Sequence, residues 1–205
     1  MRALASRTCV ALLSFVYVAV CFVGTGLGNL SVYWAEEKFG WGAAATLQFD
    51  LMCVVGGVAG ACAAAGLGHV LGYTRYVSYA CFGGAGGCAA IALPATSSVA
   101  VRLLIPVVTA SVTTYVGARA ELTPTVGAKH QGQMQGAISM LTNLASVGAL
   151  EAYLRMFDAT TGGAPKAPAF STIWFASAGV LVLAASGALA AGEGDVKSHA
   201  LRVAR

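Results

Sequence analysis

The chain has 205 residues, of which 58% are hydrophobic and 10% are charged, and its mean hydropathy is +0.75. Soluble domains carry about 25% charged residues, so this composition excludes a water-soluble globular protein. The formal net charge of +4 is modest and belongs to basic loops and a basic tail, which argues against a nucleic-acid-binding patch. We therefore expect a chain surrounded by membrane lipid, with no nucleic-acid partner.

Six apolar stretches follow one another, and each is close to the ~20 residues that a helix needs to cross a bilayer. They lie at about 8–28, 42–66, 76–93, 99–118, 133–156 and 170–191. The sequence predicts an all-α membrane protein with one six-span domain over 1–192 and a cytoplasmic tail over 193–205. Short loops between the spans leave no room for an appended soluble catalytic domain.

The first stretch has a second interpretation as a signal peptide, because Arg2 and Arg7 precede an apolar run. That run is longer than the 7–15 residues of a usual signal core, and it lacks a clear cleavage site. We favour a retained span.

Six crossings place both ends of the chain on one side of the membrane, and the basic residues indicate which side. Eight of the twelve basic residues fall on the side of the termini: Arg2, Arg7, Arg75, Arg119, Lys129, Lys197, Arg202 and Arg205. Positive residues favour the cytoplasm, so we predict a multi-pass protein with both termini cytoplasmic. Trp34 and Trp41 bracket the first outer loop, where interfacial aromatic residues are common, and 158–168 is predicted to be a flexible outer connection.

Small residues within the spans indicate close helix packing. Gly56 and Gly60 are four residues apart in the second span, and Gly83 and Gly87 repeat that spacing in the third. The six cysteines all fall in apolar stretches without metal-ligand spacing, which favours a packing role.

No catalytic constellation or phosphate-binding loop is present in the sequence. We therefore predict a protein that is not an enzyme, with no cofactor and no metal site.

Polar side chains form rows on three of the predicted spans. The residues of each row share one helical face: Ser14, Tyr17, Cys21 and Thr25 in the first span, Arg102, Thr109 and Thr113 in the fourth, and Gln131, Gln135, Ser139, Thr142 and Ser146 in the fifth. Polar groups at membrane depth usually face a bundle interior or a wet cavity, so the rows predict one shared polar space. Alternatively, the Ser and Thr hydroxyls bond carbonyls of their own helices.

Three charged residues fall within or beside the predicted spans. Asp50 lies about 12 Å inside the second span, taking 1.5 Å per residue. Arg102 and Glu151 lie nearer the outer interface, where they could snorkel towards water, and Arg102 could pair with either acid. Each charge therefore has a functional interpretation as a pathway contact and a structural one as an ion pair.

The run 131–136 reads Gln-Gly-Gln-Met-Gln-Gly, and 141–146 follows it with Leu-Thr-Asn-Leu-Ala-Ser. Together with the Phe-Gly-Trp of 39–41 and the loop 68–75, these segments resemble the drug:proton antiporter branch of the major facilitator superfamily. The resemblance covers most of the chain and matches its six spans to helices seven to twelve, the C-terminal half of such a transporter.

This resemblance implies transport of a small organic solute by alternating access, including proton-coupled efflux, with the first, second, fourth and fifth spans lining the pathway. Among the polar residues at membrane depth, we expect the pathway contacts to be Asp50, Arg102, Gln135, Asn143 and Glu151. The resemblance also implies a cytoplasmic gate motif at Gln131, Gly132, Gln133 and Gly136.

A lone half would need a partner to enclose a cavity, either an N-terminal six-helix half or a second copy. Two alternatives stay open at this point. The chain is a truncated product of a longer transporter gene, or it is a transport-inactive membrane protein that binds or regulates a partner.

Overall fold

The computed structural model describes residues 2–93, 96–117, 119, 130–161 and 171–203, with the backbone alone for 2–7, 157–161 and 193–203. These residues form helices and no strand. The elements are α1 (Arg2–Phe39), α2 (Ala43–Leu71), α3 (Tyr73–Ala92), α4 (Ser98–Val112), α6 (Gln131–Thr161) and α7 (Ser171–Val203). Part of the predicted outer connection, 162–168, and Lys129 lie outside the described residues.

Five segments of the described chain are long and apolar enough to cross a membrane, which establishes an all-α integral membrane protein. Four of them correspond to α1, α2, α6 and α7, and the fifth is α4 with the residues that follow it to Gly117. The predicted third span corresponds to α3, which is not among the five. Its first turn carries Tyr73, Thr74 and Arg75, and its centre is rich in glycine. The average hydropathy of α3 is therefore lower than that of the five spanning segments.

Helix α1 extends well beyond the predicted end of the first span at residue 28. Its 38 residues make a rod of about 57 Å, longer than the ~30 Å hydrocarbon core of a bilayer. The extension continues because Trp34 and Ala35 are buried against the bundle. Trp34 makes an edge-to-face contact with Trp174, with ring centroids 5.2 Å apart. This Trp therefore belongs to the core rather than to a lipid-facing aromatic belt.

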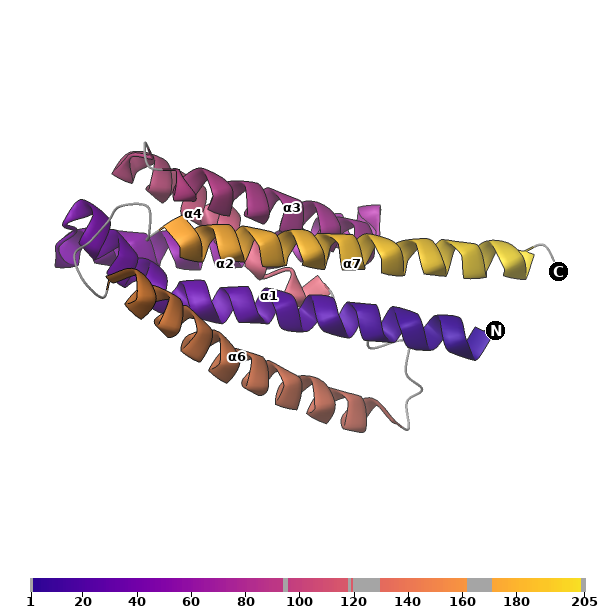
Figure 1. The fold of residues 1–205 in the computed structure, drawn as a ribbon. Helices are drawn as coiled ribbons and strands as arrows, with labels where there is room; N and C mark the ends of the chain where they lie inside the picture. Colours follow the sequence, from indigo (N-terminus) through magenta and orange to yellow (C-terminus); the bar gives the residue numbers. More distant parts are fainter. Residues whose placement is uncertain (1, 94–95, 118, 120–129, 162–170, 204–205) are drawn as a thin grey trace.

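The helices form a bundle in which α3 packs mainly on α7 and α4, and α2 packs mainly on α4. Helix α1 packs on α7 and, on its other side, on α6 (Figure 1). The beginning of α6 stands away from the end of the bundle that holds the N-terminus, whereas α3 and α7 are closely packed. Both termini lie at the same end of the bundle, as an even number of crossings predicts.

Two glycines bring α2 into direct backbone contact with α4. A Cβ built at Gly56 would lie 2.6 Å from Pro106 Cα, and one built at Gly60 would lie 2.6 Å from Ala110 Cα. The predicted packing role of this pair is therefore confirmed. In α3 the predicted Gly87 faces α4, but its companion there is Gly84 rather than the predicted Gly83, where an added Cβ would meet nothing within 4 Å.

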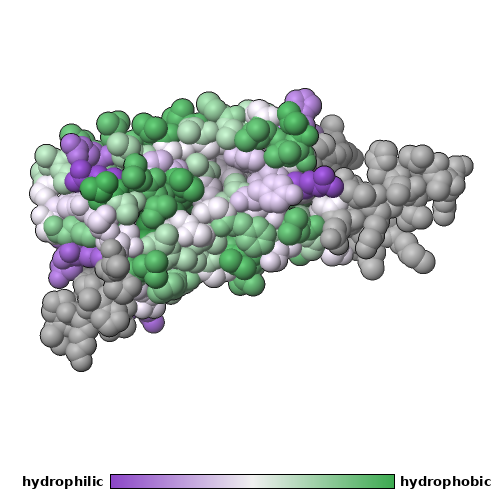
Figure 2. Space-filling view, turned by 90° about the horizontal axis from the view of Figure 1, so that it is seen from above, coloured by the Kyte–Doolittle hydropathy of each residue, from purple (hydrophilic) through white to green (hydrophobic). Residues whose placement is uncertain are grey.

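The outside of the bundle carries large apolar side chains around its middle, as a lipid-exposed surface requires. Figure 2 shows hydrophobic residues across the length of the molecule and strongly hydrophilic ones towards its two ends. Helix α2 contributes many of these exposed apolar residues, such as Leu51, Val54 and Val58.

Candidate functional site

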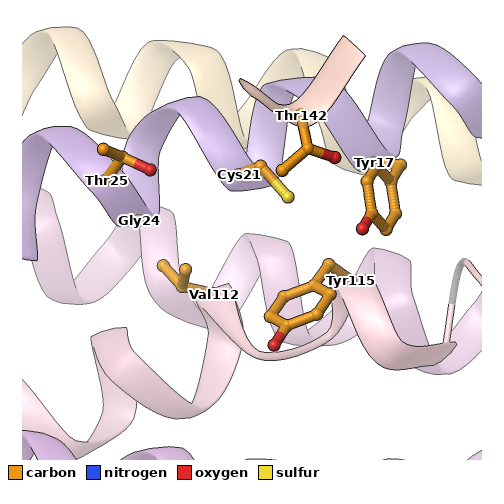
Figure 3. A pocket seen from close by; sticks show the side chains of 7 residues that line it. All are labelled: Tyr17, Cys21, Gly24, Thr25, Val112, Tyr115 and Thr142. Carbon is orange, nitrogen blue, oxygen red and sulfur yellow. The ribbon is translucent and has the colours of Figure 1, made fainter. Parts of the chain in front are cut away.

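A pocket of about 420 Å³ lies on the side of the bundle where α1, α4 and α6 meet (Figure 3). Its lining is Tyr17, Cys21, Gly24, Thr25, Val112, Tyr115 and Thr142. This volume falls within the roughly 300–1,000 Å³ that is usual for small-molecule sites. The pocket is therefore large enough for an organic solute.

Helix α1 supplies the largest share of this lining. Tyr17, Cys21 and Thr25 follow one another at four-residue intervals, so one helical face carries all three. This is the polar row predicted for the first span, except that Ser14 does not line the pocket. Tyr17 meets Tyr115 edge-to-face, with ring centroids 5.9 Å apart, and the two rings form one wall.

Helix α6 forms the opposite edge of the pocket through Thr142. The Thr142 hydroxyl donates to the Ile138 carbonyl of its own helix at 2.8 Å, and the same side chain interacts with the Cys21 thiol of α1. One turn further along, the Ser146 hydroxyl lies 3.1 Å from that of Thr25 and links α6 to α1. The predicted rows of the first and fifth spans therefore converge at Thr142 and Ser146, whereas Gln131, Gln135 and Ser139 of the fifth-span row do not line the pocket.

The polar row of the fourth span points elsewhere. Thr109 and Thr113 donate to their own helix carbonyls at 2.8 Å, and their methyl groups face Gly57 of α2. The alternative interpretation, in which hydroxyls bond within their helix, holds for both. Because Pro106 shares this face and packs directly on Gly56, α2 occupies the space that the row was expected to open. The shared polar space thus involves two rows rather than three.

Sequence reasoning missed three lining residues, Gly24, Val112 and Tyr115. Helix α4 ends at Val112, and a turn at 113–114 redirects the chain before Tyr115. The side chain of Tyr115 consequently faces α1 across the pocket. Tyr115 comes two residues after Thr113, and nothing in the sequence there indicates that the helix ends in a turn.

The five predicted pathway residues lie outside the pocket lining. Arg102 donates to Gln48 Oε1 at 3.1 Å, and its guanidinium carbon lies 5.0 Å from the centre of the Trp41 ring. It therefore ties α4 to the start of α2 rather than pairing with an acid. Asp50 is exposed on α2, and Asn143 is exposed on α6.

Glu151 and Gln135 have partners of their own. Glu151 accepts from Arg155 Nε at 2.7 Å, one turn along the same exposed helix surface. Gln135 Oε1 accepts from Arg119 Nε at 2.9 Å and also from Arg119 Nη2. These contacts make Gln135 a link between α6 and the segment after α4, at the end of the bundle that holds the termini.

The predicted gate motif surrounds this link. Gln133 Oε1 lies 3.1 Å from His130 Nδ1, which shapes the beginning of α6. Gly132 and Gly136 are exposed and have no neighbour within 4 Å, and Gln131 is partly buried. A role of these four residues in gating stays a prediction.

The pocket has a definite chemical character: it offers aromatic faces, hydroxyl and thiol groups and aliphatic surface, and none of its lining residues is charged. A formal charge buried there without a counter-charge would be costly in the low-dielectric membrane interior. The arrangement favours an uncharged, amphipathic solute. Within the described residues no group of His, Cys, Asp or Glu could hold a metal ion.

The fold defines an all-α integral membrane protein, and a pocket without charged lining residues lies on the side of its helix bundle. Comparison with protein families, with curated proteins and with solved structures finds no match. Membership of the major facilitator superfamily therefore stays a prediction based on the motifs.

Proposed function

We propose that this protein forms one wall of a transmembrane solute pathway, as the six-helix half of a secondary transporter. Helices α1, α4 and α6 line the pathway, and α3 and α7 support it from behind. In this proposal α3 also crosses the membrane, which makes six spans and leaves both termini in the cytoplasm.

The observation that carries the proposal is the meeting of polar and aromatic side chains from three helices in one pocket at membrane depth. Polar groups on membrane helices are costly unless they bond one another or line a wet cavity. Tyr17, Cys21 and Thr25 extend over two turns of α1, so the polar surface runs along the helix axis as a pathway wall requires.

The closeness of packing differs between the two sides of the bundle, and this asymmetry also supports the proposal. Helices α3 and α7 pack closely on each other, whereas α6 is attached mainly to α1. Alternating access requires some elements that stay rigid and others that rock. In this assignment α6 is the moving element, and the Arg119 link to Gln135 holds its cytoplasmic end.

Thiol labelling of Cys21 tests whether the pocket is wet. The variant retains Cys21 and replaces the other five cysteines with alanine, and it is exposed in native membranes to a membrane-impermeant methanethiosulfonate. Thiols react as thiolates, which form in water and not in hydrocarbon. We expect Cys21 to be labelled and this labelling to slow when a transported solute occupies the pocket.

Two matched single-cysteine chains provide the controls. Cys62 is exposed on α2, where lipid covers it, and Cys88 is fully buried between helices. Neither should react at the rate of Cys21. Labelling of Cys21 no faster than that of Cys62 would remove the proposed pathway.

A further inference from the structure

Asn143 is an exposed amide in the middle of a membrane-spanning helix. The span runs over Gln131–Met156, so Asn143 lies about 18 Å from either end. In the part of the chain that the structure describes, its side chain makes no hydrogen bond. A carboxamide can make four hydrogen bonds, and leaving them unmade in hydrocarbon is costly. This side chain therefore needs a partner from outside the described residues.

Ser139, one turn before Asn143, also lacks a hydrogen-bond partner among the described residues. It is exposed and makes no hydrogen bond within the described residues. Other hydroxyls of these helices behave differently: Ser177 donates to the Ile173 carbonyl and Ser186 to the Val182 carbonyl of their own helix. Asn29, another exposed amide of the spans, donates to the Thr25 carbonyl at 2.7 Å. Ser139 and Asn143 differ in this respect from Ser177, Ser186 and Asn29.

The same face is shaped for close approach of another helix. Gly132, Gly136, Ser139 and Asn143 follow at steps of four, three and four residues and share one side of α6. Both glycines have open space around them. The helix is held to the bundle by a different side, which carries the buried Ile138, Ala149 and Tyr153.

We infer that this face of α6 binds the same face of a second copy of this chain. In a two-fold interface each residue meets its own counterpart, and the carboxamide of Asn143 can both donate to and accept from its image. None of the four residues on this face of α6 is charged, so the faces of two copies do not repel each other. The two glycines let the two helix backbones approach closely. An acid or a base at this position would have required a different partner.

A dimer built this way also closes the pocket. Thr142 lines the pocket and is adjacent to Asn143, while Ser146, two turns from Ser139, bonds α1 beside it. The second copy lies along this edge and supplies the wall that α6 alone leaves open. Dimerisation does not depend on transport, and its test is independent of Cys21 labelling.

Disulfide cross-linking in native membranes tests the contact. Ser139→Cys is introduced into the full chain and oxidised with copper phenanthroline, and Leu141→Cys is the matched control. Leu141 is exposed on the same helix, about 160° from Ser139. We expect a product of twice the chain mass from Ser139→Cys and only the parent level from Leu141→Cys. Equal yields, or a product of another mass, would overturn the inference.

The role of the amide is tested by measuring the dimer fraction of the purified chain in mild detergent against concentration. Asn143→Leu should weaken association about tenfold, because it removes two interhelical hydrogen bonds of the size measured in membrane proteins. Asn29→Leu removes an exposed amide that is already bonded within α1, and it should leave association unchanged. Equal effects of the two variants, or a purely monomeric parent chain, would contradict a second copy on this face.

Discussion

Replacing Gly56 with alanine should separate α2 from α4 and destabilise the protein. The new Cβ would lie 2.6 Å from Pro106 Cα and from the Pro106 carbonyl oxygen, about 0.8 Å inside the 3.4 Å at which ordinary contacts begin. Both obstructing atoms belong to the backbone, so no side-chain rotation relieves the clash. The helices must move apart, and the contacts around Gly60 loosen with them.

The magnitude follows from two opposing contributions to the free energy of unfolding. Overpacking of this kind costs about 1–3 kcal/mol. Alanine favours a helix over glycine by about 1 kcal/mol, which offsets part of that cost. The net loss lies between about 0 and 2 kcal/mol, and its central value of about 1 kcal/mol lowers the unfolding midpoint of a chain of this length by about 2–4 °C.

Gly57→Ala is the matched control. It makes the same substitution one residue along the helix, where the new Cβ would meet Thr113 and Thr109 methyl groups at ordinary distances of 3.7 and 3.8 Å. The assay heats each full-length variant in mild detergent and measures the fraction that still elutes as a monodisperse species. Gly56→Ala should lose this fraction at a lower temperature, and Gly57→Ala should match the parent or exceed it. If Gly56→Ala proved as stable as Gly57→Ala, the direct backbone contact between α2 and α4 would be refuted.

Two further predictions use the same assay. Tyr153→Phe should cost about 1 kcal/mol, because it removes the buried hydrogen bond between the Tyr153 and Ser177 hydroxyls, whose oxygens lie 2.5 Å apart. Tyr33→Phe, at a site that is 60% exposed, should cost nothing measurable, and equal losses would contradict the buried bond. Arg102→Leu should cost about 1 kcal/mol through its lost ring stacking and hydrogen bond. Arg155→Leu should change stability by less than about 0.5 kcal/mol, since its ion pair is exposed, and a larger effect there than at Arg102 would reverse this ranking.

Much of the architecture followed from composition and periodicity. Apolar stretches longer than a bilayer core predict helices, because only a helix satisfies every backbone group within its own segment. Five of the predicted spans have counterparts among the helices fit to cross a membrane. The pairing of Gly56 with Gly60 was equally accessible, since a four-residue spacing places two small residues on one helical face.

The candidate site was accessible from the sequence only in part. The row Tyr17, Cys21 and Thr25 was found because side chains four residues apart share a helical face in any α-helix. Which face of α4 meets α1 and which meets α2 depends on how each helix is rotated within the bundle. That rotation is decided by close contacts such as Pro106 on Gly56, between residues that are far apart in the sequence.

The sequence by itself determined that the chain is helical, that it resides in a membrane and which side chains share a face of each helix, because these properties depend on local composition and helical period. The tertiary structure decided that Tyr115 joins the pocket after a turn and that Arg102 stacks on Trp41 instead of pairing with Asp50 or Glu151. Such contacts join distant segments, and their geometry is set by the packing of all the helices together rather than by any one of them.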